Sequence, residues 1–183
     1  MSPHQSRERA RAVLHAWFIT FSCYGHRMHG DEHGSIDRDH NKFGTDVLPK
    51  NIHRELAERK QMSAKPYSLD KASQQIVLHA LQEVCRHRGW ILFAAHVRST
   101  HVHMVVRAQE RPERIMSDCK AYASRALRAA VDKSLQPWSR HGSTRYLWMR
   151  ENLEDVIHYV VRQQGPAAAV FEAWDRSLTL AAL

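Results

Sequence analysis

Two histidines separated by one residue are the first side chains in this chain whose spacing could do chemistry. His101 and His103 open an apolar run that ends at Ala108, and such a run predicts a β-strand. Side chains alternate between the two faces of a strand, so both imidazoles should project from one face and could bind a single metal ion. The spacing alone leaves open a second interpretation, a pair of hydrogen-bonded sheet histidines without a metal.

A tyrosine near the C-terminal end could act as a nucleophile. A helix is predicted from a cap at Asn152 to Gln164, where Gly165 and Pro166 stop it. At about 100° per residue, Tyr159 lies roughly 120° from the centre of the apolar stripe, and Gln163 lies one turn further along the same flank. A phenol that the core does not need is a candidate nucleophile, and the amide oxygen is a candidate third metal ligand; a plain surface tyrosine is the alternative. The residues on the face of that stripe are Leu153, Val156, Ile157, Val160 and Gln164.

The elements that must position these side chains follow from periodicity and turn residues. A helix whose apolar residues follow the helical repeat begins at a Ser68 cap, and Pro112 opens another. The expected strands are Trp17 to Tyr24, Trp90 to Arg98, His101 to Ala108, and a short one at Tyr146 to Met149. The order β-α-β-β-α-β-α predicts an α+β fold, a ferredoxin-like antiparallel sheet with helices on one face plus a C-terminal helix carrying the tyrosine.

One domain is expected over residues 1–183, because this length can bury a continuous core without disulfides or metals. Between about residues 25 and 66 the periodicity disappears, and glycines and prolines punctuate a polar run that we interpret as a long loop or insertion. Histidines in this region, such as His29 and His33, could form a second metal site, although irregular spacing is more typical of polar loop residues.

The charge of the chain indicates a polyanionic partner. Lys and Arg outnumber Asp and Glu by 27 to 19, which gives a formal charge of +8 and a pI near 9.8. A basic protein without a nucleic-acid partner remains the alternative on charge alone. Tyr122 falls on the apolar stripe of its helix, which favours core packing over contact with such a partner. The candidate contacts to a polyanion, which would include a nucleic acid, are Arg98, Lys120, Arg125 and Arg145.

Three scattered cysteines, without a C-x-x-C pair, suggest neither a disulfide framework nor a thiolate zinc site. The first residues contain no apolar stretch of signal-peptide length, and nowhere do some 18 apolar residues run together. We therefore expect a soluble cytoplasmic protein without a membrane partner.

Taken together, the motifs resemble a known family. The H-x-H strand, followed on the last helix by Tyr159-Val160-Val161-Arg162-Gln163, is similar to the single-tyrosine HUH nucleases, specifically the insertion-sequence and REP-associated transposases. The segment from Arg145 to Trp148 is also like that family. The resemblance covers roughly residues 17–165, least well between 25 and 66.

The resemblance implies that His101 and His103 are the HUH metal ligands, Gln163 the third ligand and Tyr159 the nucleophile. It further implies an Mg²⁺ or Mn²⁺ cofactor, single-stranded or hairpin DNA as substrate, a 5′-phosphotyrosine intermediate, strand transfer by reversal, and a homodimer. One position departs from the family, which usually has Asp or Asn before the first histidine. Thr100 stands there, and it can hydrogen-bond His101 but brings no charge.

Two other functions fit the same residues. A domesticated DNA-binding protein would keep the fold without cleaving, as Thr100 and the long insertion would allow. A metal-dependent phosphoesterase would use the same histidines without needing Tyr159. Detection of a covalent protein–DNA adduct distinguishes the three.

Overall fold

The computed structural model describes residues 16–26, 60, 62, 64–148, 150–166 and 168–173. The histidines at 29 and 33, and nearly all of the proposed insertion at 25–66, lie outside these residues. The proposals of a second metal site and of one domain over the whole chain therefore stay predictions.

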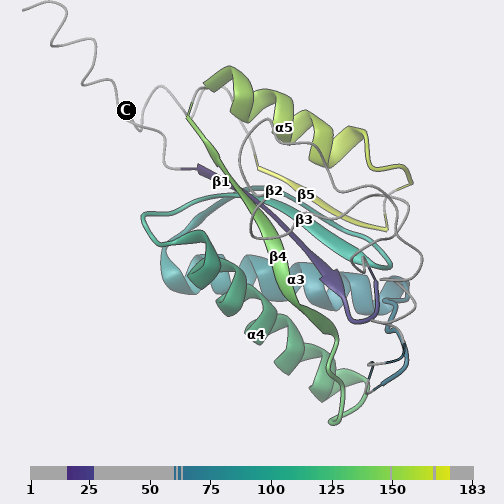
Figure 1. Cartoon of the computed structure of the whole chain (residues 1–183). Coiled ribbons are helices and arrows are strands. Elements are labelled where there is room, and N and C mark those ends of the chain that lie inside the picture. The colour runs from purple at the N-terminus through teal and green to yellow at the C-terminus, as the bar shows by residue number, and fades with distance from the viewer. Residues whose placement is uncertain are drawn as a thin grey trace, which may run out of the picture.

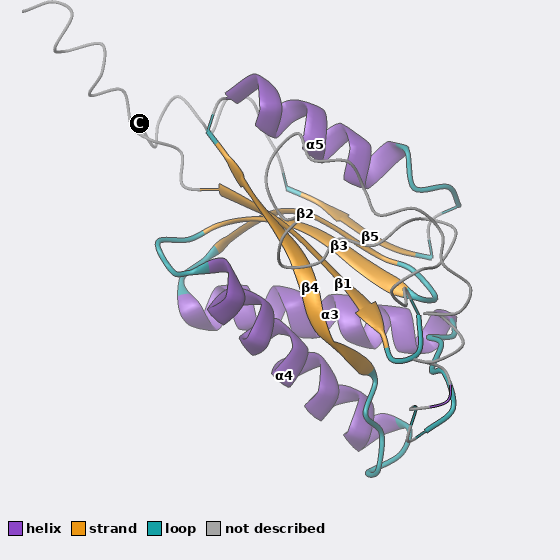
Figure 2. Cartoon of the chain, viewed as in Figure 1, coloured by secondary structure: helices purple, strands orange, loops and turns teal. Residues whose placement is uncertain are grey.

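Five antiparallel strands form one sheet in the order β4-β1-β3-β2-β5 (Figure 2). The strands are β1 (Ala16–Cys23), β2 (Ile91–Val97), β3 (His101–Arg107), β4 (Trp138–Leu147) and β5 (Ala169–Glu172). The helices are α3 (Lys71–Arg88), α4 (Pro112–Ala130) and α5 (Arg150–Arg162). The order β4-β1-β3-β2 is that of a ferredoxin-like unit, so the predicted fold class is confirmed.

Helices α3 and α4 cover one face of the sheet and α5 covers the other (Figure 1). On β3, Val102, Met104 and Val106 pack with α3 and α4, while Val105 packs with α5. The alternation of strand side chains thus splits the core into two layers, and it places the histidines on the α5 side.

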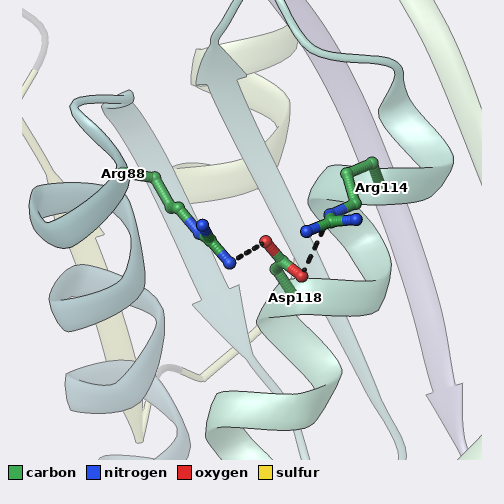
Figure 3. A network of polar contacts seen from close by, with 3 residues as sticks. All are labelled: Arg88, Arg114 and Asp118. Carbon is green, nitrogen blue, oxygen red and sulfur yellow. Dashed lines mark ion pairs between the residues drawn. The ribbon is translucent and has the colours of Figure 1, made fainter.

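The two helices of the larger layer are joined by an ion-pair network as well as by apolar packing. Asp118 on α4 forms ion pairs with Arg88 at the end of α3 (Nη2 to Oδ2, 2.9 Å) and with Arg114 one turn earlier on α4 (Nε to Oδ1, 3.4 Å) (Figure 3). The Asp118 carboxylate therefore links the C-terminal turn of α3 to the N-terminal half of α4.

Several predicted boundaries were wrong. Asp70, not Ser68, caps α3, accepting the backbone N–H of Ser73 at 2.7 Å. Helix α5 begins at Arg150, so Asn152 is a residue within the helix and not its cap. The helix ends at Arg162, two residues before the expected end.

The fourth strand was predicted too short, and the fifth was not predicted. Strand β4 spans ten residues and includes Gly142, because it is an edge strand whose exposed residues are polar and carry no apolar alternation. A β-carbon at Gly142 would lie 2.5 Å from the carbonyl oxygen of Thr20, so the close approach of β1 requires glycine there. Strand β5 pairs antiparallel with β2 and has only four residues, too few to show a period.

Candidate active site

The two histidines of the H-x-H motif lie together on the face that α5 covers. Their ring centroids are 4.7 Å apart. His103 is buried and His101 is half-buried, so one imidazole is enclosed while the other lies nearer to solvent. This arrangement confirms the predicted placement of both rings on one face of the strand.

Each histidine is held by a threonine hydroxyl at the same ring nitrogen. Oγ1 of Thr20, on β1, lies 2.8 Å from Nδ1 of His103, and Oγ1 of Thr100 lies 3.0 Å from Nδ1 of His101. When Nδ1 carries the proton and donates it to the hydroxyl oxygen, the lone pair is on Nε2, the form that binds metals. The family usually has Asp or Asn at the position of Thr100. The contact shows that the threonine can also hold the ring of His101 at Nδ1.

Helix α5 brings Tyr159 to this pair of histidines. The phenol ring lies 6.0 Å from the ring of His103 and 6.2 Å from that of Phe18. Phe18 stacks on His103 at 5.7 Å, so the three rings form one cluster across β1, β3 and α5. Tyr159 is 40% exposed, so part of the residue is accessible to solvent.

The apolar stripe of α5 explains why the tyrosine is exposed. Leu153, Val156, Ile157 and Val160 are all buried against the sheet, as the sequence predicted. Tyr159 lies on the flank of that stripe, at the border between the covered and the uncovered parts of the sheet.

A third histidine fixes the last turn of α5 and was not anticipated from the sequence. His96 on β2 is 1% exposed, and its Nδ1 donates to the carbonyl oxygen of Val160 at 3.0 Å. Burial lowers the pKa of His96, which favours the neutral ring needed next to the proposed metal ligands. His96 is the cross-strand neighbour of His103, a relation that only the strand register reveals.

Gln163 follows the last residue of α5, and its backbone N–H donates to the carbonyl oxygen of Tyr159 at 3.1 Å. It therefore lies one turn after the tyrosine, as expected. Its amide nitrogen donates to Nδ1 of His158 at 3.3 Å. The role of its amide oxygen as a third metal ligand remains a prediction.

In the described part of the chain, no three histidine, cysteine or carboxylate side chains come together as a metal site. The ligand set predicted from the sequence, His101, His103 and Gln163, stays a prediction. Imidazole nitrogens and an amide oxygen are donors that divalent transition metals accept.

Two of the four predicted DNA contacts lie on the histidine side of the molecule. The guanidinium of Arg145, on β4, lies 5.8 Å from the centre of the Phe18 ring and so borders the ring cluster. Arg98 follows β2, and its Nη1 would lie 3.6 Å from a β-carbon at Gly165. It therefore lies beside the chain that leaves α5.

The other two lie on α4, on the opposite side of the sheet (Figure 1). Lys120 donates to the carbonyl oxygens of Ser139 and His141 at 2.9 and 3.0 Å, and burial lowers its pKa to about 8. Arg125 lies 4.3 Å over the ring of Tyr122, which packs against the core as predicted. DNA bound at the histidines would have to pass around edge strand β4 to reach either cation.

Among the described residues, no helix is both long and apolar enough to cross a lipid bilayer. All three cysteines are buried, and each is a free thiol.

Known proteins resemble this chain in sequence and in structure. The REP-associated tyrosine transposase bound to a REP hairpin shares 13% identity with a TM-score of 0.44, over 81% of this chain and 66% of that one. A protein from Deinococcus radiodurans R1 described as a transposase shares 13% identity with a TM-score of 0.44, over 83% of this chain and 92% of that one. None of the curated proteins matches. The family described as "Transposase IS200 like" matches residues 50–163, well over half of the 183 residues. This chain therefore belongs to the IS200-like transposase family, as its motifs predicted.

Proposed function

We propose that the protein is a single-stranded DNA endonuclease and strand transferase that forms a covalent 5′-phosphotyrosine through Tyr159. The observation that carries the proposal is the 6.0 Å separation of the Tyr159 and His103 rings, with His101 next to His103. A nucleophile from α5 and two metal-binding groups from β3 thus meet at one exposed position. Membership of a transposase family supplies the reaction class.

His101, His103 and Gln163 are the residues that we propose to hold a divalent ion, Mg²⁺ or Mn²⁺. The two threonine hydroxyls support this, because a hydroxyl oxygen that accepts the proton of Nδ1 leaves the lone pair of Nε2 for a metal ion. When bound, such an ion would withdraw charge from the scissile phosphate.

The chain's own residues would carry the bond exchange. The phenol oxygen of Tyr159 loses its proton to solvent and forms a bond to phosphorus, while the bond from phosphorus to the 3′ oxygen breaks. The departing 3′ oxygen takes up a proton, and the 5′ phosphate stays on the protein as an ester. Attack by another 3′-hydroxyl reverses these steps and joins two strands without consuming a nucleotide.

Single-stranded or hairpin DNA is the proposed substrate, because an exposed tyrosine on the flank of a helix needs a backbone that can bend into it. The formal charge of +8 and the position of Arg145 beside the ring cluster favour a polyanion there. Lys120 and Arg125 would serve only DNA that continues around β4. A homodimer remains our prediction from the family resemblance.

The test is to trap the covalent adduct. Wild type, Tyr159→Phe and Tyr122→Phe are incubated with Mn²⁺ and single strands labelled at either the 5′ or the 3′ end, and label is sought on denatured protein. Wild type and Tyr122→Phe should retain the fragment 3′ of the cut through its 5′ phosphate, whereas Tyr159→Phe should retain nothing. Tyr122→Phe is the matched control, since it removes the same oxygen from a ring on the other face of the sheet.

Each alternative has its own outcome. An adduct on Tyr159→Phe would refute the nucleophile, and cleavage by wild type without any adduct would establish the phosphoesterase. DNA binding without cleavage at any metal concentration would establish the domesticated protein.

A further inference from the structure

Three aromatic rings form a ladder at the end of edge strand β4, outside the candidate active site. Trp17 on β1 contacts Tyr146 on β4 with ring centroids 4.7 Å apart. Tyr146 in turn contacts Trp148 at 4.1 Å and an interplanar angle of 73°. We call these three residues the aromatic ladder. It begins among residues packed against the α3 and α4 layer and ends in solvent.

Trp148 is 70% exposed, more than any other large hydrophobic side chain among the described residues. An indole left in water loses the stabilisation that burial would give it. The edge-on contact with Tyr146 supports one side of the Trp148 ring, and contacts that restrict a side chain reduce the entropy lost when a flat ligand stacks on it. Trp148 is thus exposed and yet backed by a second aromatic ring.

The surroundings of Trp148 do not favour a hydrophobic protein partner. The other exposed large hydrophobics of the described residues are Ile91, Val131 and Tyr159. Ile91 begins β2, and two strands lie between β2 and β4, so it is roughly 14 Å away at the usual strand spacing. One isolated indole beside a polar edge strand lacks the contiguous apolar area that protein docking sites expose.

The aromatic ladder lies further from the candidate nucleophile than Arg145 does, along the same strand. Arg145 borders the ring cluster of Phe18, His103 and Tyr159. Trp148 follows three residues later, about 10 Å along an extended chain. A stacked single strand rises about 3.4 Å per nucleotide, so roughly three nucleotides cover that distance.

We propose that Trp148, backed by Tyr146, is a base-stacking site for an unpaired nucleobase of the DNA strand, about three nucleotides beyond the phosphate that Arg145 contacts. The inference rests on the proposed DNA substrate but not on cleavage or on the metal. Every nucleobase has a flat π face, so such a site holds a strand without reading its sequence. Arg145 contacts the backbone nearer the tyrosine, and the strand then bends around the free edge of β4 to place one base on Trp148.

Binding of a fluorescent oligothymidylate of about 20 nucleotides tests the proposal. Anisotropy is measured with EDTA present and in the Tyr159→Phe background, so that neither metal nor covalent capture contributes. Trp148→Leu should bind about 5- to 30-fold more weakly, because it keeps apolar bulk but has no π face. Trp148→Phe should recover most of the affinity. Ile91→Ala, which removes an exposed apolar side chain from another strand, is the control and should bind like Tyr159→Phe alone.

A second measurement locates the base. Single abasic sites are moved along the oligonucleotide, and one position should weaken binding to the Trp148-containing protein while leaving Trp148→Leu unaffected. If Trp148→Leu binds as tightly as the starting protein, or as tightly as Trp148→Phe, base stacking on Trp148 is refuted. The nuclease proposal would be unaffected by this result. A changed mass in light scattering for Trp148→Leu would assign the indole to a contact between two copies instead. Failure of the starting protein to bind any single strand would refute both proposals.

Discussion

Removal of the hydroxyl that holds His103 should weaken metal binding more than any other change outside the ligands. Thr20→Val keeps the β-branched shape that suits β1. It replaces the hydroxyl, whose oxygen lies 2.8 Å from Nδ1 of His103, with a methyl group. Both side chains are buried, at 8% and 4% exposed. Water cannot easily reach this buried position to replace the Thr20 oxygen, so the contact that orients the ring is lost, and the imidazole can rotate or move its proton to Nε2.

Each of these responses harms metal binding by a predictable amount. An unsatisfied buried donor costs about 1 to 3 kcal/mol, and a proton on Nε2 occupies the lone pair that would bind the ion. Loss of an orienting partner of a metal-bound histidine lowers affinity by about 10- to 100-fold, which corresponds to about 1.4 to 2.7 kcal/mol. Thr100→Val should cost less than about tenfold, because Thr100 and His101 are only half-buried and water can take the place of the hydroxyl.

Titration calorimetry with Mn²⁺ on EDTA-treated protein measures these affinities. Thr144→Val is the matched control, since Thr144 pairs with Ile19 and belongs to the opposite face of the sheet. Thermal unfolding of each metal-free variant shows whether the fold is retained. Wild-type affinity in Thr20→Val would show that the hydroxyl does not orient the ligand. A larger loss in Thr100→Val than in Thr20→Val would refute the argument from burial.

Three further predictions concern stability. Asp118→Asn should lower the free energy of unfolding in urea by about 0.5 to 1 kcal/mol by weakening the ion pair with Arg88, and the difference should shrink at high salt. Gly142→Ala should destabilise by about 1 to 3 kcal/mol in the same assay, because its β-carbon would meet the backbone of Thr20. Burial lowers the pKa of Lys120 to about 8 from 10.5. Below pH 8 both states are protonated and the cost of the buried charge is fully present; above it the folded state loses its proton first. The stability of wild type relative to Lys120→Met should therefore rise between about pH 8 and 10.5, and a flat difference would contradict the pKa.

The sequence predicted those parts of the site that depend on local periodicity. Alternation along β3 placed His101 and His103 on one face, and the helical repeat placed Tyr159 beside the stripe of α5. Both periodicities are set by backbone geometry within a single element. These two predictions are therefore correct even though the predicted start of α5 was three residues too late and its predicted end two residues too late.

Long-range partners could not be predicted in the same way. Thr20 meets His103 across 83 residues, and His96 meets Val160 across 64. Each is a polar residue within an apolar strand, which signals a buried polar contact but does not identify the partner. The extent of β4 was missed for a related reason, since an edge strand with one solvated side needs no apolar alternation.

The covering of both sheet faces explains how this α+β domain can hold one exposed tyrosine beside two histidines. Burial of the α5 stripe fixes the rotation of that helix, and the hydrogen bond from His96 to the carbonyl of Val160 fixes its last turn. Tyr159 directly precedes Val160, so the buried stripe and the His96 hydrogen bond both fix its backbone. The residue nevertheless remains 40% exposed. The packing of α5 thus determines where the phenol lies, and the threonine hydroxyls contact Nδ1 of each histidine. The position of the tyrosine and the orientation of the histidines are set by separate groups, and a change to one can leave the other intact.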